Sequence, residues 1–87
     1  MTARVVTVGI GVLDQVWELP ALPPMPGKYI ATGLRVTGGG MAATAAVAVA
    51  ALGGEAAWCG RLGADAVGES LLARLRAAGV DTRGVDV

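Results

Sequence analysis

A run of three glycines that opens directly into an alanine-rich stretch constrains this chain most. Gly38, Gly39 and Gly40 are followed by Met41 and then by residues 42–52, most of which are alanine or valine. Glycine permits positive φ angles and close approach of other groups, whereas alanine is the strongest helix former. We therefore expect a tight loop that leads into a helix. The first amides of such a helix have no intrahelical partner, so they can bind hydroxyls, carboxylates or phosphates.

The composition indicates a folded chain that is part of a larger fold. Of the 87 residues, 54% are hydrophobic, which is too apolar for disorder. Aromatic residues make up only 3%, and the abundant alanine and valine side chains each bury little area, so a self-contained core is not expected. The formal net charge of zero gives no indication of nucleic acid or an anionic membrane as a partner.

The cysteine and histidine counts exclude several kinds of site. A single cysteine, Cys59, cannot form an internal disulfide, and without histidine the chain has neither the ligands of a zinc or iron–sulfur site nor a Ser-His or Cys-His nucleophile. The N-terminus has no long apolar segment typical of a secretion signal, and we expect a cytoplasmic protein. The uncharged stretch 36–54 contains a helix of only about 18 Å, too short for the ~30 Å core of a membrane.

The order of the expected elements predicts an α/β fold with a parallel sheet. Residues 4–10 are apolar on both faces and rich in β-branched side chains, as in a central strand that is buried on both sides. The helix over 41–52 has small or apolar residues on every side and should also be buried. A strand over 55–60 completes a right-handed parallel crossover, and a helix over 66–78, capped by Asp65, follows it.

A proline-rich connection separates the first strand from the glycines. Residues 18–27 contain all four prolines and predict an extended surface segment. Residues 28–36 predict two short strands interrupted at Gly33, in a small accessory sheet beside the glycines. We expect this sheet to act as a lid over about residues 15–37, with exposed edges that favour a dimer contact. Residues 80–87 begin a further element.

Asp14 is the most suggestive carboxylate, because it follows the end of the first predicted strand. In open α/β sheets, ligands bind outside the carboxyl ends of the strands. The alternative is a structural role in a turn or a cap. Structural roles are also expected for Trp58 and Cys59 in a strand.

Tests for nucleotide-binding motifs give no match. The dinucleotide fingerprint fails, because Asp14 stands where its third glycine should be and prolines follow instead of a helix. The P-loop fails, because Gly27-Lys28 is followed by Tyr29 and not by serine or threonine. The kinase-type glycine-rich loop also finds no counterpart.

Three ordered segments resemble the N-terminal part of the ribokinase-like (PfkB) carbohydrate kinases. Residues 39–53 resemble the family's N-terminal signature, and residues 60–69 resemble its G-x-x-G-x-D-x-x-G segment. Residues 8–14, together with Pro26-Gly27, resemble its opening strand, substrate aspartate and lid entry. The resemblance runs almost from end to end. It implies a ribokinase-like parallel sheet flanked by helices with a small β lid, of which residues 1–87 form the N-terminal part of a single domain.

The resemblance also implies a substrate site. In the family, the aspartate after the first strand binds sugar hydroxyls and the signature glycines bring backbone amides against the sugar. The corresponding substrate-binding residues here are Asp14, Gly39, Gly40 and Thr44. The physical reading agrees, since a carboxylate opposite a helix-opening loop can hold a polyol.

Three positions depart from the family pattern. Many members have asparagine where this chain has Thr44, and sugar-binding members often have asparagine where it has Val12. Met41 replaces a residue that is polar in ribokinases. Asparagine both donates and accepts hydrogen bonds, and valine does neither. The resemblance therefore implies a less polar pocket for a sugar, a sugar acid or a nucleoside.

The activity implied by the resemblance is ATP-dependent phosphorylation of a sugar hydroxyl, with Mg²⁺, in a homodimer formed through the lid. The family's catalytic aspartate lies in a D-T-x-G-A-G-D motif, and the segment 81–84 matches only its start. No residue of this chain is therefore predicted to be catalytic, to bind ATP or to bind a metal. Two alternatives stay open: a non-catalytic sugar- or nucleoside-binding module, and an inactive or structural fragment.

Overall fold

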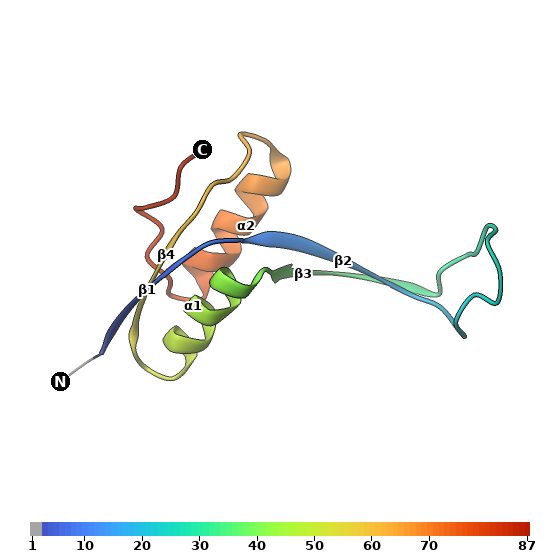
Figure 1. Ribbon diagram of the computed structural model, residues 1–87, viewed down its shortest axis with the longest axis horizontal. Helices are drawn as coiled ribbons and strands as arrows, with labels where there is room; N and C mark the ends of the chain where they lie inside the picture. The colour runs from blue at the N-terminus through green and yellow to red at the C-terminus, as the bar shows by residue number, and fades with distance from the viewer. Residues whose placement is uncertain (1–2) are drawn as a thin grey trace.

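The computed structural model describes residues 3–87, which form two small sheets and two helices (Figure 1). In chain order the elements are β1 (Arg4–Val8), β2 (Val12–Glu18), β3 (Gly33–Gly39), α1 (Met41–Ala51), β4 (Glu55–Cys59) and α2 (Ala66–Ala77). Strands β1 and β4 form a parallel pair, and β2 and β3 form an antiparallel pair. The predicted mixed α/β architecture is confirmed.

The parallel unit follows the predicted strand–helix–strand order. Strands β1 and β4 pair in register from Arg4 opposite Glu55 to Val8 opposite Cys59, and α1 forms part of the connection between them. On the other edge of β4, the backbone amide of Trp58 donates to the carbonyl of Asp81 at 3.0 Å. The C-terminal segment therefore meets β4 through an isolated parallel bridge between Ala57 and Asp81, and the further element expected from residue 80 does not extend into a strand.

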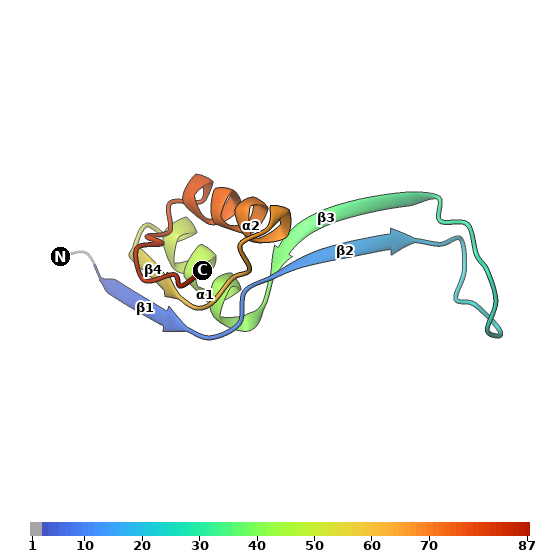
Figure 2. The same ribbon diagram turned by 90° about the horizontal axis from the view of Figure 1, so that it is seen from above.

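Both helices pack on the same face of this unit (Figure 2). The Thr7 hydroxyl donates to the carbonyl of Ala42 at 2.7 Å and so fastens the start of α1 to β1. Side chains from both helices, from β4 and from the C-terminal segment form one buried cluster: Ala43, Ala46, Ala56, Trp58, Leu71, Leu75 and Val80. The large Trp58 compensates for the small alanines around it, because it supplies most of the apolar area that alanine cannot.

The predictions of two-sided burial for β1 and all-round burial for α1 are wrong for these residues. Val8 is 76% exposed and Met41 is 89% exposed, and in α1 only Ala43 and Ala46 are buried. The apolar pattern predicts a strand and a helix with neighbours on every side. Residues 3–87 provide neighbours on one side only, so the other faces of these elements remain open to solvent.

The predicted strand pair within 28–36 is also wrong. The structure instead pairs β2 with β3, from Val12 opposite Gly39 to Glu18 opposite Gly33, and residues 28–32 form no strand. Gly38 and Gly39, which were expected in a loop, belong to β3. The partner strand lies before the prolines, where a local pattern in 28–36 cannot reveal it. The resulting β2–β3 ribbon, residues 12–39, projects from the body and gives the molecule its long dimension of 52 Å (Figure 1).

The ends of the helices follow local sequence signals. The Asp65 carboxylate accepts a hydrogen bond from the amide of Gly68 at 2.9 Å, which confirms the predicted cap of α2. Glu69 in the first turn and Arg74 and Arg76 in the last turn complement the helix dipole. In residues 3–87, neither helix has the length and hydrophobicity needed to cross a membrane.

Replacement of the α2 cap should destabilise the fold. We expect Asp65→Ala to lower the free energy of unfolding by about 1 kcal/mol, because the amide of Gly68 loses its acceptor. Urea denaturation followed by circular dichroism measures this change. Asp65→Asn, which keeps a capping oxygen, is the matched control, and equal losses in both variants would contradict the capping role.

Candidate functional site

Asp14 lies within β2, opposite Thr37 of β3. As expected, it lies beyond the C-terminal end of the parallel strand β1, but it belongs to the next strand and not to a turn or a cap. Along β2, Asp14 shares one face of the ribbon with Val16 and Glu18, and the Glu18 carboxylate forms an ion pair with Arg35 at 3.1 Å. Leu13 and Trp17 point to the opposite face. The ribbon therefore has a polar face that carries Asp14 and a more apolar face behind it.

The Asp14 carboxylate lies directly against the backbone of Gly39. A β-carbon at Gly39 would overlap the Asp14 Oδ2 atom and lie 2.9 Å from its Cγ. Gly39 is buried, although its partner strand is exposed. Glycine at this position is therefore what allows the carboxylate to sit over the end of β3.

Gly40 joins the ribbon to α1 with a backbone that favours glycine. Its φ angle is +90°, and a β-carbon there would lie 2.5 Å from the carbonyl oxygen of Ile10. The same Ile10 carbonyl accepts a hydrogen bond from the amide of Ala43 at 3.2 Å. One of the amides expected to be free for a ligand is therefore already used to attach α1 to the turn between β1 and β2.

The four predicted substrate-binding residues lie around one hollow of about 590 Å³. Asp14 provides a carboxylate, Thr44 a hydroxyl, and Gly39 and Gly40 provide backbone. The remaining lining residues are Gly38, Met41, Ala45 and Ala48. Ala45 and Ala48 were missed as lining residues. Their spacing from Met41 and Thr44, three or four residues, is the signal that places all four on one face of the helix.

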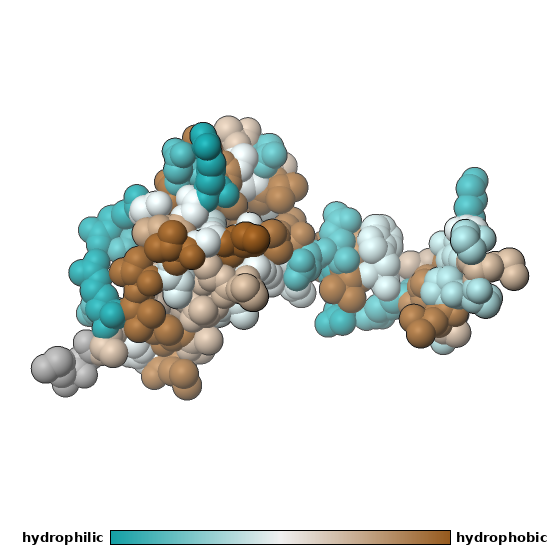
Figure 3. Space-filling model, viewed as in Figure 1, coloured by the Kyte–Doolittle hydropathy of each residue, from teal (hydrophilic) through white to brown (hydrophobic). Residues whose placement is uncertain are grey.

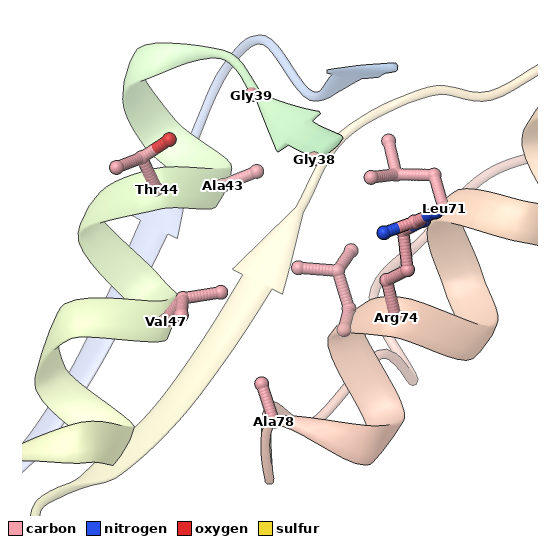
Figure 4. A pocket seen from close by; sticks show the side chains of 9 residues that line it. Gly38, Gly39, Ala43, Thr44, Val47, Leu71, Arg74 and Ala78 are labelled. Atoms are coloured by element: carbon pink, nitrogen blue, oxygen red, sulfur yellow. The ribbon is translucent and has the colours of Figure 1, made fainter. Parts of the chain in front are cut away.

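A second, smaller groove lies between the two helices (Figure 4). It has a volume of about 220 Å³ and is bounded by Gly38 and Gly39 at the end of β3. Ala43 and Val47 point from α1 toward α2, and Thr44 also lines the groove (Figure 4). Leu71, Arg74 and Ala78 form the other wall. The groove is mainly apolar, with Arg74 as its one charged lining residue, and Asp14 does not reach it.

The other acidic groups do not form a second site within residues 3–87. No three Asp, Glu or Cys side chains of that range gather as a metal site would require. Asp81, which begins the partial match to the family's catalytic motif, forms an ion pair with Arg83 at 2.6 Å. Hydrogen bonds from the Arg83 side chain lower the pKa of Asp81 to about 2. This carboxylate therefore stabilises the C-terminal segment as an anion, and the contribution is lost only as the pH falls toward 2.

The chain has the architecture of part of a ribokinase-like α/β fold. It combines a parallel unit with a helical crossover, a projecting antiparallel ribbon and a hollow at their junction. The chain matches the pfkB family of carbohydrate kinases over residues 3–87. It belongs to this family, as the sequence motifs predicted.

Individual relatives agree with this assignment. Fructokinase-1 of Oryza sativa is 55% identical over 47 residues, which cover 54% of this chain and 15% of the rice protein. The crystal structure of a candidate ribokinase from Agrobacterium tumefaciens superposes with a TM-score of 0.90 at 34% identity, over all of this chain and 28% of that one. Arabidopsis thaliana ribokinase, complexed with ribose and ATP, superposes with a TM-score of 0.81 at 30% identity, over 99% of this chain and 28% of that one. The chain thus spans less than a third of each relative.

The junction at Gly40 should tolerate no side chain. We expect Gly40→Ala to lower the free energy of unfolding by about 1–3 kcal/mol, because alanine disfavours the positive φ and its β-carbon meets Ile10. Gly53→Ala is the matched control, since Gly53 has a similar φ of +88° but nothing within 4 Å of a β-carbon. Urea denaturation compares the two. Equal losses would show that the contact with Ile10 contributes nothing.

Proposed function

We propose that this chain supplies part of the substrate site and the lid of a kinase that transfers phosphate from ATP to a hydroxyl of a sugar or a sugar-like molecule. The observation that carries the proposal is the convergence of Asp14, Thr44 and the Gly39–Gly40 backbone on one hollow. Membership of the pfkB family supports it. Relatives described as fructokinase and ribokinase support a sugar as the class of substrate.

The groups around the hollow suit a polyol. A carboxylate accepts several hydrogen bonds, so Asp14 can hold two neighbouring hydroxyls of one sugar ring. Thr44 adds one donor and acceptor, and Met41 provides an apolar surface for the carbon atoms of the ring. Val12, paired with Gly39, adds no hydrogen-bonding group beside Asp14. This favours a substrate that needs fewer polar contacts on that side, such as another sugar, a sugar acid or a nucleoside.

We assign neither ATP nor Mg²⁺ to residues of this chain. The described carboxylates are dispersed, and those at Asp81 and Asp86 are engaged by arginines. In the proposed reaction, a hydroxyl of the bound sugar would attack the γ-phosphorus of ATP in line, ADP would leave, and the hydroxyl proton would pass to a base that this chain does not supply. Mg²⁺ would neutralise the charge on the phosphates. The role of residues 3–87 is to bind and orient the acceptor, which lowers the entropic cost of that attack.

Removal of the Asp14 carboxylate tests this function. In the full-length gene product, we expect Asp14→Asn to raise KM for the sugar substrate by about 10- to 100-fold, because charge-assisted hydrogen bonds to its hydroxyls are lost. A coupled assay of ADP release, run with a panel of sugars, sugar acids and nucleosides, identifies the substrate and measures KM. The control is Asp86→Asn, because Asp86 is an exposed carboxylate that pairs with Arg61 and lies outside the hollow.

Three outcomes separate the hypotheses. An unchanged KM in Asp14→Asn would contradict the assignment of Asp14 as a substrate ligand. Calorimetric binding of a sugar that depends on Asp14, without ADP release, would favour the non-catalytic binding module. Neither binding nor turnover with any compound would leave the structural fragment as the better description.

The apolar face of the ribbon suggests a partner for the lid. Trp17 is 59% exposed and lies opposite Leu34 on the face away from Asp14. Apolar residues also gather at the far end of the ribbon: Leu22, Met25 and Ile30 (Figure 3). A two-stranded ribbon is only marginally stable by itself. We propose that a second copy of the protein packs on this face and forms a homodimer through the lid.

A charged substitution on each face tests the dimer. We expect Trp17→Lys to shift the mass of the full-length gene product from dimer to monomer, because lysine cannot be buried at the centre of an apolar contact. Multi-angle light scattering after size exclusion measures the mass. Val16→Lys, on the opposite face of the same strand, should leave it unchanged. A wild-type monomer, or equal effects of the two variants, would contradict the proposal.

A further inference from the structure

Trp58 is the centre of the core, but its polar group is unused. The side chain is 0% exposed, and its indole Nε1 has no hydrogen-bond partner among residues 3–87. Burial of an unpaired N–H opposes folding. A tryptophan in this position is therefore favoured by the size and shape of its ring, and not by a hydrogen bond.

The outer edge of the Trp58 ring lies against Gly11. A β-carbon at Gly11 would be 2.7 Å from the Cζ2 atom of Trp58 and 2.9 Å from its Cη2 atom. A β-carbon at Gly60 would overlap the same edge of the ring. The ring thus fills the space beneath the turn between β1 and β2, and only glycine at Gly11 lets that turn rest on it.

This turn carries both walls of the candidate site. Gly11 also approaches the start of α1, because a β-carbon at Gly40 would lie 2.9 Å from the Gly11 Cα. Its neighbour Ile10 accepts the hydrogen bond from Ala43 in the first turn of that helix. Along the chain, Gly11 leads directly into β2, which carries Asp14. The Thr7 hydroxyl of β1 also holds the start of α1, so a shift of the turn would move Asp14 relative to the beginning of that helix.

We propose that Trp58 is a positioning residue for substrate binding, which acts through Gly11 to set the geometry between Asp14 and the Gly39–Thr44 segment. The inference rests on the proposed function and goes beyond it, because Trp58 lines neither hollow and touches no substrate. Its effect is mechanical: the ring supports the turn, and the turn holds the strand of Asp14 against the helix start. In close-packed interiors, such contacts transmit displacements of less than an ångström.

Two substitutions test the mechanism, one that crowds the turn against the Trp58 ring and one that removes this crowding. Gly11→Ala should push the turn away from the ring and raise KM by about 10-fold or more with kcat changed by less than about twofold, the pattern of a misplaced binding group. Adding Trp58→Phe should restore KM to within about threefold of wild type, because a phenyl ring lacks the outer Cζ2 and Cη2 atoms that crowd Gly11. Trp58→Phe alone should raise KM by about threefold to tenfold, because the turn loses the ring edge that supports it. In the double variant, the methyl group introduced by Gly11→Ala fills the space that this edge leaves.

A glycine on the other face of the sheet provides the matched control. A β-carbon at Gly84 would lie 2.5 Å from the Cys59 Sγ atom, a similar degree of crowding far from the ribbon. Gly84→Ala should lower the melting temperature without changing KM, and Trp58→Phe should not rescue it. The amide resonances of Gly39, Gly40 and Thr44 give a readout that needs no activity: Gly11→Ala should shift them, and the double variant should return them.

The outcomes distinguish this inference from the proposed function. If the protein phosphorylates no sugar, the proposed function fails, and the amide resonances still decide whether Trp58 positions the site. If Gly11→Ala lowers only the melting temperature and leaves KM and the three resonances unchanged, Trp58 has a purely structural role and the inference is wrong. Failure of Trp58→Phe to rescue a folded Gly11→Ala protein would also overturn it.

Discussion

The crossing of two backbone segments, Ile10–Gly11 over Gly40, is the contact on which the rest of the structure depends. At this point the parallel unit, the projecting ribbon and α1 meet within van der Waals distance. The crossing requires a positive φ at Gly40 and no side chain at Gly11 or Gly40. It also uses the Ile10 carbonyl to satisfy an amide of the first helical turn, which would otherwise need a partner. The candidate site lies beside this crossing because three elements with different chemistry converge there.

The two faces of the β1–β4 pair contribute unequally to the stability of the fold. On one side, alanines at close spacing let α1 approach the sheet, and Trp58 with Leu71 fills the space that remains. On the other, β1 exposes Val6 and Val8, so the apolar surface there contributes nothing to folding of the described residues (Figure 3). An exposed apolar strand next to a well-packed core is what a one-sided layer produces when its sequence is suited to two sides. Stability therefore depends strongly on the few large residues of the single buried face.

The same architecture explains why one part of the candidate site is held firmly and the other projects into solvent. Its floor, the start of α1, is fastened by Thr7 and Ile10 to the parallel unit. Its carboxylate lies on the ribbon, which extends away from the body and has few contacts beyond its own two strands (Figure 1). A rigid floor with a carboxylate on a projecting ribbon suits a site that closes over a small polar ligand. Trp58 links the two parts, because it supports the one turn that they share.

Local sequence signals determined a large part of this protein. Glycine followed by alanine set the start of α1, Asp65 and the glycines set the helix boundaries, and the spacing of three motifs identified the family and the four residues that surround one hollow. Each of these depends on neighbours in sequence, where propensity and capping act. Only the tertiary structure decided that Asp14 lies on an antiparallel strand whose partner begins at Gly33, since pairing across the prolines is non-local. It alone revealed the stacking of Trp58, Gly11 and Gly40, because close packing between distant residues leaves no periodic pattern in the chain.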